Sequence, residues 1–216
     1  MNSQTEKLLI AGPAGQIECA IDRPAAERAP RGVAVLCHPN PTQGGTMDNK
    51  VVQTLARAFV QLGYRAVRFN FRGIGASAGT WDEGRGEVDD ALAVIAATRE
   101  RFAALPAFAL AGFSFGGYVA ATAAARLPAA QQPQRLALVA PSTLKHEVPP
   151  VPAHTLLVHG ETDDVVPLSA SLDWARPQQL PVLVVPGVGH FFHGALHILK
   201  TALLRAWAAP HEPSGN

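Results

Sequence analysis

Short apolar runs alternate with amphipathic segments along most of the chain. Residues 32–37 are apolar throughout, which is typical of a strand buried on both faces. The spacing of Val52, Leu55 and Phe59 places three apolar side chains on one face of a helix, and it predicts a helix over residues 48–62. This alternation of strand and helix signals indicates an α/β fold with a mostly parallel sheet.

The same patterns predict the other elements. Gly12-Pro13-Ala14-Gly15 is a short turn, so the first two strands should form an antiparallel hairpin. We expect an eight-stranded, mostly parallel sheet with helices on both faces. The predicted strands are residues 7–11, 16–22, 32–37, 65–71, 108–113, 136–140, 155–159 and 182–185. Further helices are predicted around Val88, Leu92 and Ile95, from Ser114 to Leu127, and around Leu196, Leu199, Leu203 and Trp207.

A candidate nucleophile lies between a predicted strand and a predicted helix. Gly112-Phe113-Ser114-Phe115-Gly116 matches the G-x-S-x-G nucleophile elbow, in which small residues permit a sharp, strained turn. The turn would place Ser114 at a helix N-terminus, where the Phe115 N–H and the helix dipole favour negative charge. We predict Ser114 as the nucleophile, with a purely structural Gly/Ser turn as the alternative.

A serine nucleophile needs a base and a carboxylate that orients the base, and this fold supplies them in the order serine, acid, histidine. Asp163 and Asp164 follow the predicted strand 155–159, and His190 follows the strand 182–185 after Gly187-Val188-Gly189. The carboxyl ends of parallel strands form the ligand-binding edge of such a sheet. Both loops should therefore lie near the serine.

In these motifs the chain resembles the α/β-hydrolase superfamily over essentially its whole length. It is most similar to the small, lidless, dienelactone-hydrolase-like serine members, which also carry loops similar to residues 38–45 and 70–79. The superfamily usually has its acid in Gly-x-x-Asp-x-x-Val-Pro and its histidine in Gly-x-Gly-His. The resemblance therefore selects Asp163 over Asp164 and His190 over the nearby His193. Serine replaces the cysteine of dienelactone hydrolases proper, so a dienelactone substrate is not implied.

The loop after Cys37 should complete an oxyanion hole, which needs two aligned N–H donors. Pro39 has no N–H, so the Asn40 amide is the better partner for the Phe115 amide. The resemblance implies hydrolysis of carboxylic esters with small or short acyl groups through an acyl-enzyme, without a metal or organic cofactor. Thioesters, acyl transfer by the same triad and a non-catalytic binding protein remain alternatives.

We expect structural roles for several other polar residues. His38 should fix the oxyanion loop by packing, and Arg72 should hold its turn through backbone carbonyls. His193 and His197 have the spacing of a metal pair but no partnering cluster, so we interpret them as ordinary helix residues. Glu87, Asp89 and Asp90 look like a solvated, acidic helix start.

The composition of the 216-residue chain fits one globular domain, with 48% hydrophobic and 16% charged residues. A net charge of +1 argues against nucleic-acid or anionic-membrane partners and leaves a small-molecule substrate. The N-terminus is polar and lacks the apolar run that is typical of a signal peptide, so we expect a cytoplasmic protein whose Cys19 and Cys37 are reduced, buried strand residues. Residues 1–6 and 210–216 should be loose tails. The proline-rich connection 141–153 should not form a lid helix.

Overall fold

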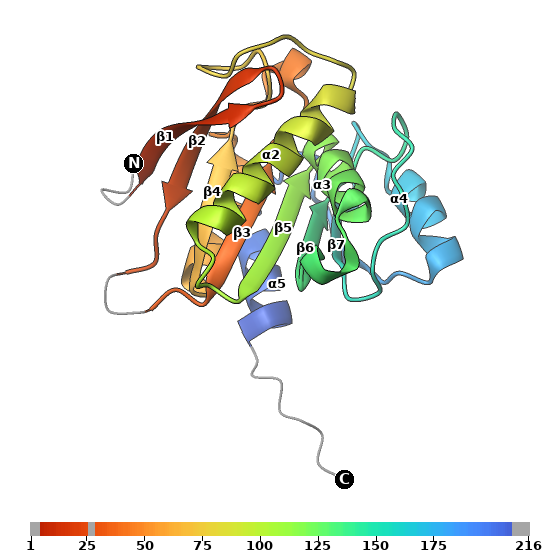
Figure 1. The fold of residues 1–216 in the computed structure, drawn as a ribbon. Coiled ribbons are helices and arrows are strands. Elements are labelled where there is room, and N and C mark those ends of the chain that lie inside the picture. Colours follow the sequence, from red (N-terminus) through yellow and green to blue (C-terminus); the bar gives the residue numbers. More distant parts are fainter. Residues whose placement is uncertain (1–4, 26–28, 209–216) are drawn as a thin grey trace.

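A computed structural model describes residues 5–25 and 29–208, and within them the strands form one eight-stranded sheet (Figure 1). The strand order is β1-β2-β4-β3-β5-β6-β7-β8. Strand β2 pairs antiparallel with both β1 and β4, and all other neighbours pair in parallel. The strands are β1 (Glu6–Gly12), β2 (Gly15–Asp22), β3 (Gly32–Cys37), β4 (Tyr64–Phe69), β5 (Ala107–Phe113), β6 (Arg135–Val139), β7 (Leu156–Gly160) and β8 (Val182–Val185).

Helices cover both faces of this sheet. Figure 1 shows α2 and α3 in front of the central strands and α5 behind them. Helices α1 and α5 share a core cluster on one face, and α2 and α3 share a second cluster on the other. The predicted α/β-hydrolase fold is thus confirmed. The helices are α1 (Lys50–Gln61), α2 (Arg85–Arg101), α3 (Phe115–Arg126), α4 (Leu168–Ala175) and α5 (Leu196–Ala208).

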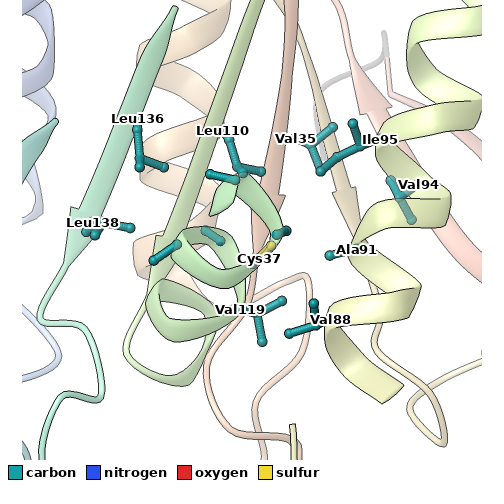
Figure 2. Packing of buried hydrophobic residues seen from close by; sticks show 14 of the residues in the cluster. Val35, Cys37, Val88, Ala91, Val94, Ile95, Leu110, Val119, Leu136 and Leu138 are labelled. Atoms are coloured by element: carbon teal, nitrogen blue, oxygen red, sulfur yellow. The ribbon is translucent and has the colours of Figure 1, made fainter. Parts of the chain in front are cut away.

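The two core clusters follow the two-residue period of the strands. In β3, Val35 and Cys37 pack toward α2 and α3, whereas Ala34 and Leu36 face the α1 side. Burial of a larger side chain of this set, such as Val35 or Leu36, contributes roughly 1.5–3 kcal/mol. Figure 2 shows the α2 side, where Val35, Leu110, Leu136 and Leu138 of the strands lie near Val88, Ala91, Val94 and Ile95 of α2 and Val119 of α3.

Both cysteines are part of this core, as predicted. Cys19 and Cys37 are free and buried. Burial raises the pKa of the Cys19 thiol to about 12 and moves the pKa of Cys37 in the same direction. Neither thiol is therefore a reactive thiolate at neutral pH.

The acidic start of α2 differs from the expectation. Asp89 is half-buried, but Glu87 and Asp90 are buried. The Glu87 carboxylate accepts hydrogen bonds from the Asp82 and Gly84 amides and so caps the helix. Asp90 pairs with Arg72, whose guanidinium Nη2 lies 2.8 Å from the carboxylate. The predictions of a solvated acidic patch and of an Arg72 bound to carbonyls were therefore wrong for these residues.

Other boundary predictions have mixed outcomes. Strand β4 ends at Phe69, earlier than expected, and the next residue, Asn70, uses its side chain to hydrogen-bond to the Met47 amide and to Glu18. Residues 141–155, all of them described, contain no helix, so no lid helix follows β6. Of the predicted tails, residues 1–4 and 209–216 lie outside the described residues, whereas Glu6 begins β1. No helix in the described part of the chain is long and apolar enough to cross a membrane.

Candidate active site

The nucleophile elbow has the strained geometry that its sequence predicts. Ser114 connects β5 to α3 with φ 55° and ψ −120°, a backbone conformation that residues other than glycine rarely adopt. The chain folds back so tightly that a Cβ on Gly112 would lie 1.9 Å from the Gly116 carbonyl oxygen. A Cβ on Gly116 would lie 2.2 Å from the Cys37 carbonyl oxygen. Both flanking glycines are thus required by close backbone approach.

The structure brings the three predicted triad residues together. His190 Nε2 lies 3.0 Å from Ser114 Oγ, and His190 Nδ1 lies 2.7 Å from Asp163 Oδ2. All three residues are buried, although they come from loops after three different strands, β5, β7 and β8. The competing residues Asp164 and His193 are exposed.

The Asp163 carboxylate is held ionised. Its Oδ1 accepts hydrogen bonds from the backbone amides of Val165, at 2.9 Å, and Val166, at 2.8 Å. Burial alone would raise the pKa of Asp163, but interactions with His159, His190 and the Val166 amide hold this pKa well below its ordinary value. An ionised Asp163 favours the His190 tautomer with its proton on Nδ1, which leaves Nε2 free to accept the serine proton.

Two backbone N–H groups lie in the loops that flank Ser114. The Phe115 N–H is at the first position of α3, where the helix offers no acceptor. Among the described residues, every hydrogen bond of Asn40 uses its oxygens: the carbonyl accepts from Gln43 and Gly45, and the side chain from Thr42. These bonds fix the Asn40 loop.

Aromatic and apolar side chains flank the elbow, some of them exposed and others buried. Phe191 is 45% exposed and its ring contacts the His190 ring edge-on at 5.0 Å. Leu144 is 61% exposed on the loop whose Ser142 amide donates to the Ser114 carbonyl. On the other flank, Phe115 contacts the rings of Trp81, Tyr118 and His146.

One residue of the site is missing from the sequence-based predictions. His159, near the end of β7, lies 3.3 Å from Asp163 Oδ2 and is completely buried. The available signal was a histidine at the end of an otherwise apolar strand, just before the acid loop. His193 and His197 remain ordinary exposed residues. Within the described ranges, no three His, Cys, Asp or Glu residues are grouped so that they could hold a metal ion.

Residues 28–155 match the family model described as serine aminopeptidase, S33, which covers more than half of the chain. The chain belongs to this family. It is therefore a serine hydrolase of the α/β-hydrolase superfamily. Its curated relatives include a protein of uncharacterised function from Rickettsia prowazekii, which is 31% identical over 86% of this chain and 82% of the relative.

Solved structures support the same assignment. An α/β serine hydrolase without a lid from Xanthomonas campestris is 39% identical, with a TM-score of 0.85 over 95% of this chain and 94% of that protein. An α/β serine hydrolase homologue from Coxiella burnetii is also 39% identical, with a TM-score of 0.82 over 93% and 96% of the two chains. Est1E from Butyrivibrio proteoclasticus, solved with ferulic acid, is 17% identical with a TM-score of 0.76 over 92% and 96%, and it shares the fold.

Proposed function

We propose that this hydrolase cleaves carboxylic esters of small or short-acyl substrates through a covalent acyl-enzyme. The observation that carries the proposal is the bridging position of His190, 3.0 Å from Ser114 Oγ and 2.7 Å from Asp163 Oδ2. A serine hydroxyl is a weak nucleophile at neutral pH, and an adjacent base that is itself oriented by a carboxylate activates it.

The reaction proceeds in two balanced steps. His190 Nε2 takes the Ser114 proton as Oγ attacks the ester carbonyl, and the imidazolium returns that proton to the departing alcohol as the acyl-enzyme forms. Water then attacks the acyl carbon, giving its proton to His190, and the proton returns to Ser114 as the acid is released. Asp163 stabilises the imidazolium in both steps.

The proposal assigns the oxyanion to the backbone amides of Phe115 and Asn40. The Phe115 amide is at the positive end of the α3 dipole, which favours developing negative charge. The Asn40 loop is held close to the start of α3, because the Cys37 and His38 carbonyl oxygens lie where a Gly116 side chain would begin. Loss of one such donor typically costs a factor of about 10²–10³ in kcat.

The surroundings of Ser114 favour small substrates. The connection after β6 has no helix that could cover the site, and Leu144 and Phe191 are largely exposed. A substrate can contact these side chains with its first few carbons, but a long acyl chain would extend into water.

The decisive experiment compares the wild type with Ser114→Ala on esters, thioesters and aminoacyl anilides. We expect the wild type to hydrolyse activated short-chain esters and to react with a fluorophosphonate, and Ser114→Ala to lose both, with a fall in turnover of about 10⁴-fold or more. Product analysis in the presence of an added alcohol distinguishes the two activities: an acyltransferase forms a new ester with that alcohol, whereas a hydrolase releases the free acid. Wild-type protein that is folded but unreactive toward the fluorophosphonate would instead indicate a binding protein.

A further inference from the structure

His159 is the one polar side chain of strand β7 (Leu156–Gly160). It lies against the loop that carries Asp163. Its side chain is completely buried. The ring Nε2 lies 2.8 Å from the Val166 carbonyl oxygen and 3.3 Å from Asp163 Oδ2. A polar ring buried in the sheet is costly unless it is hydrogen-bonded, so these two contacts explain why it can be there.

The surroundings fix which nitrogen of His159 carries the proton. Both atoms near Nε2, the Val166 carbonyl oxygen and Asp163 Oδ2, are acceptors. Among the described residues, Nδ1 has no hydrogen-bond partner although it is buried. A proton on Nδ1 would be a buried donor without an acceptor, whereas a proton on Nε2 is used. His159 is therefore a neutral Nε2–H donor whose proton is shared between Val166 and Asp163.

With this donor included, both oxygens of the Asp163 carboxylate have two partners. Oδ1 accepts from the Val165 and Val166 amides, and Oδ2 is approached by His190 Nδ1 at 2.7 Å and His159 Nε2 at 3.3 Å. A carboxylate has about four lone-pair sites. All of them are occupied, so the carboxylate has no free site that would favour rotation away from His190.

We propose that His159 is a positioning residue of the catalytic triad: its Nε2–H holds the Asp163 carboxylate and the turn to Val166 in the orientation that His190 requires. The inference rests on the proposed function of Ser114, since it assigns a role in that reaction. His159 touches neither the substrate nor the serine. It acts through Asp163.

The shared oxygen gives this role a measurable electrostatic consequence. The second donor on Oδ2 disperses charge that would otherwise act on the His190 imidazolium alone. The titratable groups that face His159 are Asp163 on its own loop and His190 on the loop after β8; Glu161 and Asp164 are exposed. Without the His159 donor, the imidazolium form of His190 is stabilised more strongly. The acid limb of the kcat/KM profile should then move to higher pH.

The test compares His159→Leu with His159→Gln. Leucine fills the space without a donor, whereas the glutamine side-chain nitrogen can occupy the place of Nε2. We expect His159→Leu to lower kcat by about 10- to 100-fold, as for loss of a hydrogen bond to a charged group, with KM unchanged and the acid limb displaced upward. His159→Gln should restore kcat to within about threefold and return the limb to its original position. Circular dichroism and thermal unfolding check the fold, and His159→Met replaces the leucine variant if that variant does not fold.

A readout that needs no turnover separates this inference from the proposed function. The proton between His190 Nδ1 and Asp163 can be followed by NMR with ¹⁵N-labelled histidine. We expect its resonance to shift in His159→Leu and to be restored in His159→Gln. A lower melting temperature with unchanged kcat, acid limb and resonance would make His159 a packing residue and overturn the inference. If the wild type cleaves no ester but the resonance shifts as expected, the proposed function fails while the positioning of Asp163 stands.

Discussion

The Nε2 atom of His38 accepts a hydrogen bond from the backbone N–H of Phe71 at 3.0 Å, and this bond ties the end of β3 to the turn that follows β4. The other ring nitrogen, Nδ1, lies 2.7 Å from the Pro39 carbonyl oxygen, to which it can only donate. Both contacts are satisfied by the neutral ring with its proton on Nδ1. His38 thus holds the base of the Asn40 loop, as the sequence suggested, and protonation would break its bond to Phe71.

This arrangement predicts a loss of stability in mild acid. Burial lowers the pKa of His38 from its ordinary 6.5 to about 4, although the Pro39 carbonyl opposes the change. Between these two values the unfolded chain binds a proton that the folded protein rejects, so the folded state loses stability as pH falls. Across the whole interval the free energy of unfolding should fall by about 3 kcal/mol. We expect urea unfolding to show full stability above about pH 6.5 and a decline toward pH 4.

The control for this prediction is His38→Gln, which cannot titrate. Its stability should depend less on pH in this window, with a residual slope because burial also lowers the pKa of His146. Asp163 does not interfere: its depressed pKa stabilises the fold above the ordinary carboxyl range, and that contribution is lost only in stronger acid. Equal slopes in the wild type and His38→Gln would show that His38 is not the titrating group.

Neighbouring residues test the triad assignment directly. Asp163→Asn should lower kcat by about 10⁴-fold, because the amide favours the wrong His190 tautomer, whereas Asp164→Asn should retain most activity. His190→Ala should be similarly impaired and His193→Ala should not. The measurement is kcat/KM on an activated ester. An inactive Asp164→Asn or His193→Ala with an active partner variant would reassign the triad.

The sheet and the meeting of Ser114, Asp163 and His190 at one of its edges could be predicted because most of the signals for them are local. Strand residues such as Val35 and Cys37 are apolar in an unbroken run, and the position of Ser114 follows from two glycines and the flanking strand and helix. Parallel topology then brings the ends of β5, β7 and β8 to one edge, so the loops that carry Asp163 and His190 could be placed beside Ser114. The choice of Asp163 over Asp164 and of His190 over His193 came from the family resemblance.

The remaining features depend on contacts that the local sequence does not encode. The burial of Asp90 depends on Arg72, which is distant in sequence and reaches it only once α2 packs on the sheet. His159 looked like the last residue of a strand because its importance comes from the return of the chain to Asp163 and Val166. Helix α4 was missed because its eight residues are too few to show a clear helical period.

The Arg72–Asp90 pair predicts a large stability difference between adjacent residues of α2. The Asp90 side chain is 1% exposed and Arg72 12%, so Asp90→Asn leaves a nearly buried guanidinium without its countercharge. We expect a loss of about 3–5 kcal/mol in the free energy of unfolding. Asp89→Asn removes the exposed pair with Arg126 and should cost at most about 1 kcal/mol. Equal effects in urea unfolding would show that the buried pair contributes no more than the surface pair.

The last prediction concerns the acyl group that the site accepts. Each methylene that leaves water contributes about 0.8 kcal/mol, or roughly a fourfold gain in kcat/KM, as long as the protein covers it. Around Ser114 only exposed side chains such as Leu144 and Phe191 offer such cover, and the connection after β6 forms no helix above them. The gain should therefore stop after a few carbons. On p-nitrophenyl esters we expect kcat/KM to be highest for acetyl to butyryl groups, to fall for longer chains, and to show no jump when the substrate forms micelles. Phe191→Ala should reduce the butyryl-to-acetyl ratio of kcat/KM while sparing acetate turnover. A steady rise to palmitoyl esters, or strong interfacial activation, would mean that another element covers the site.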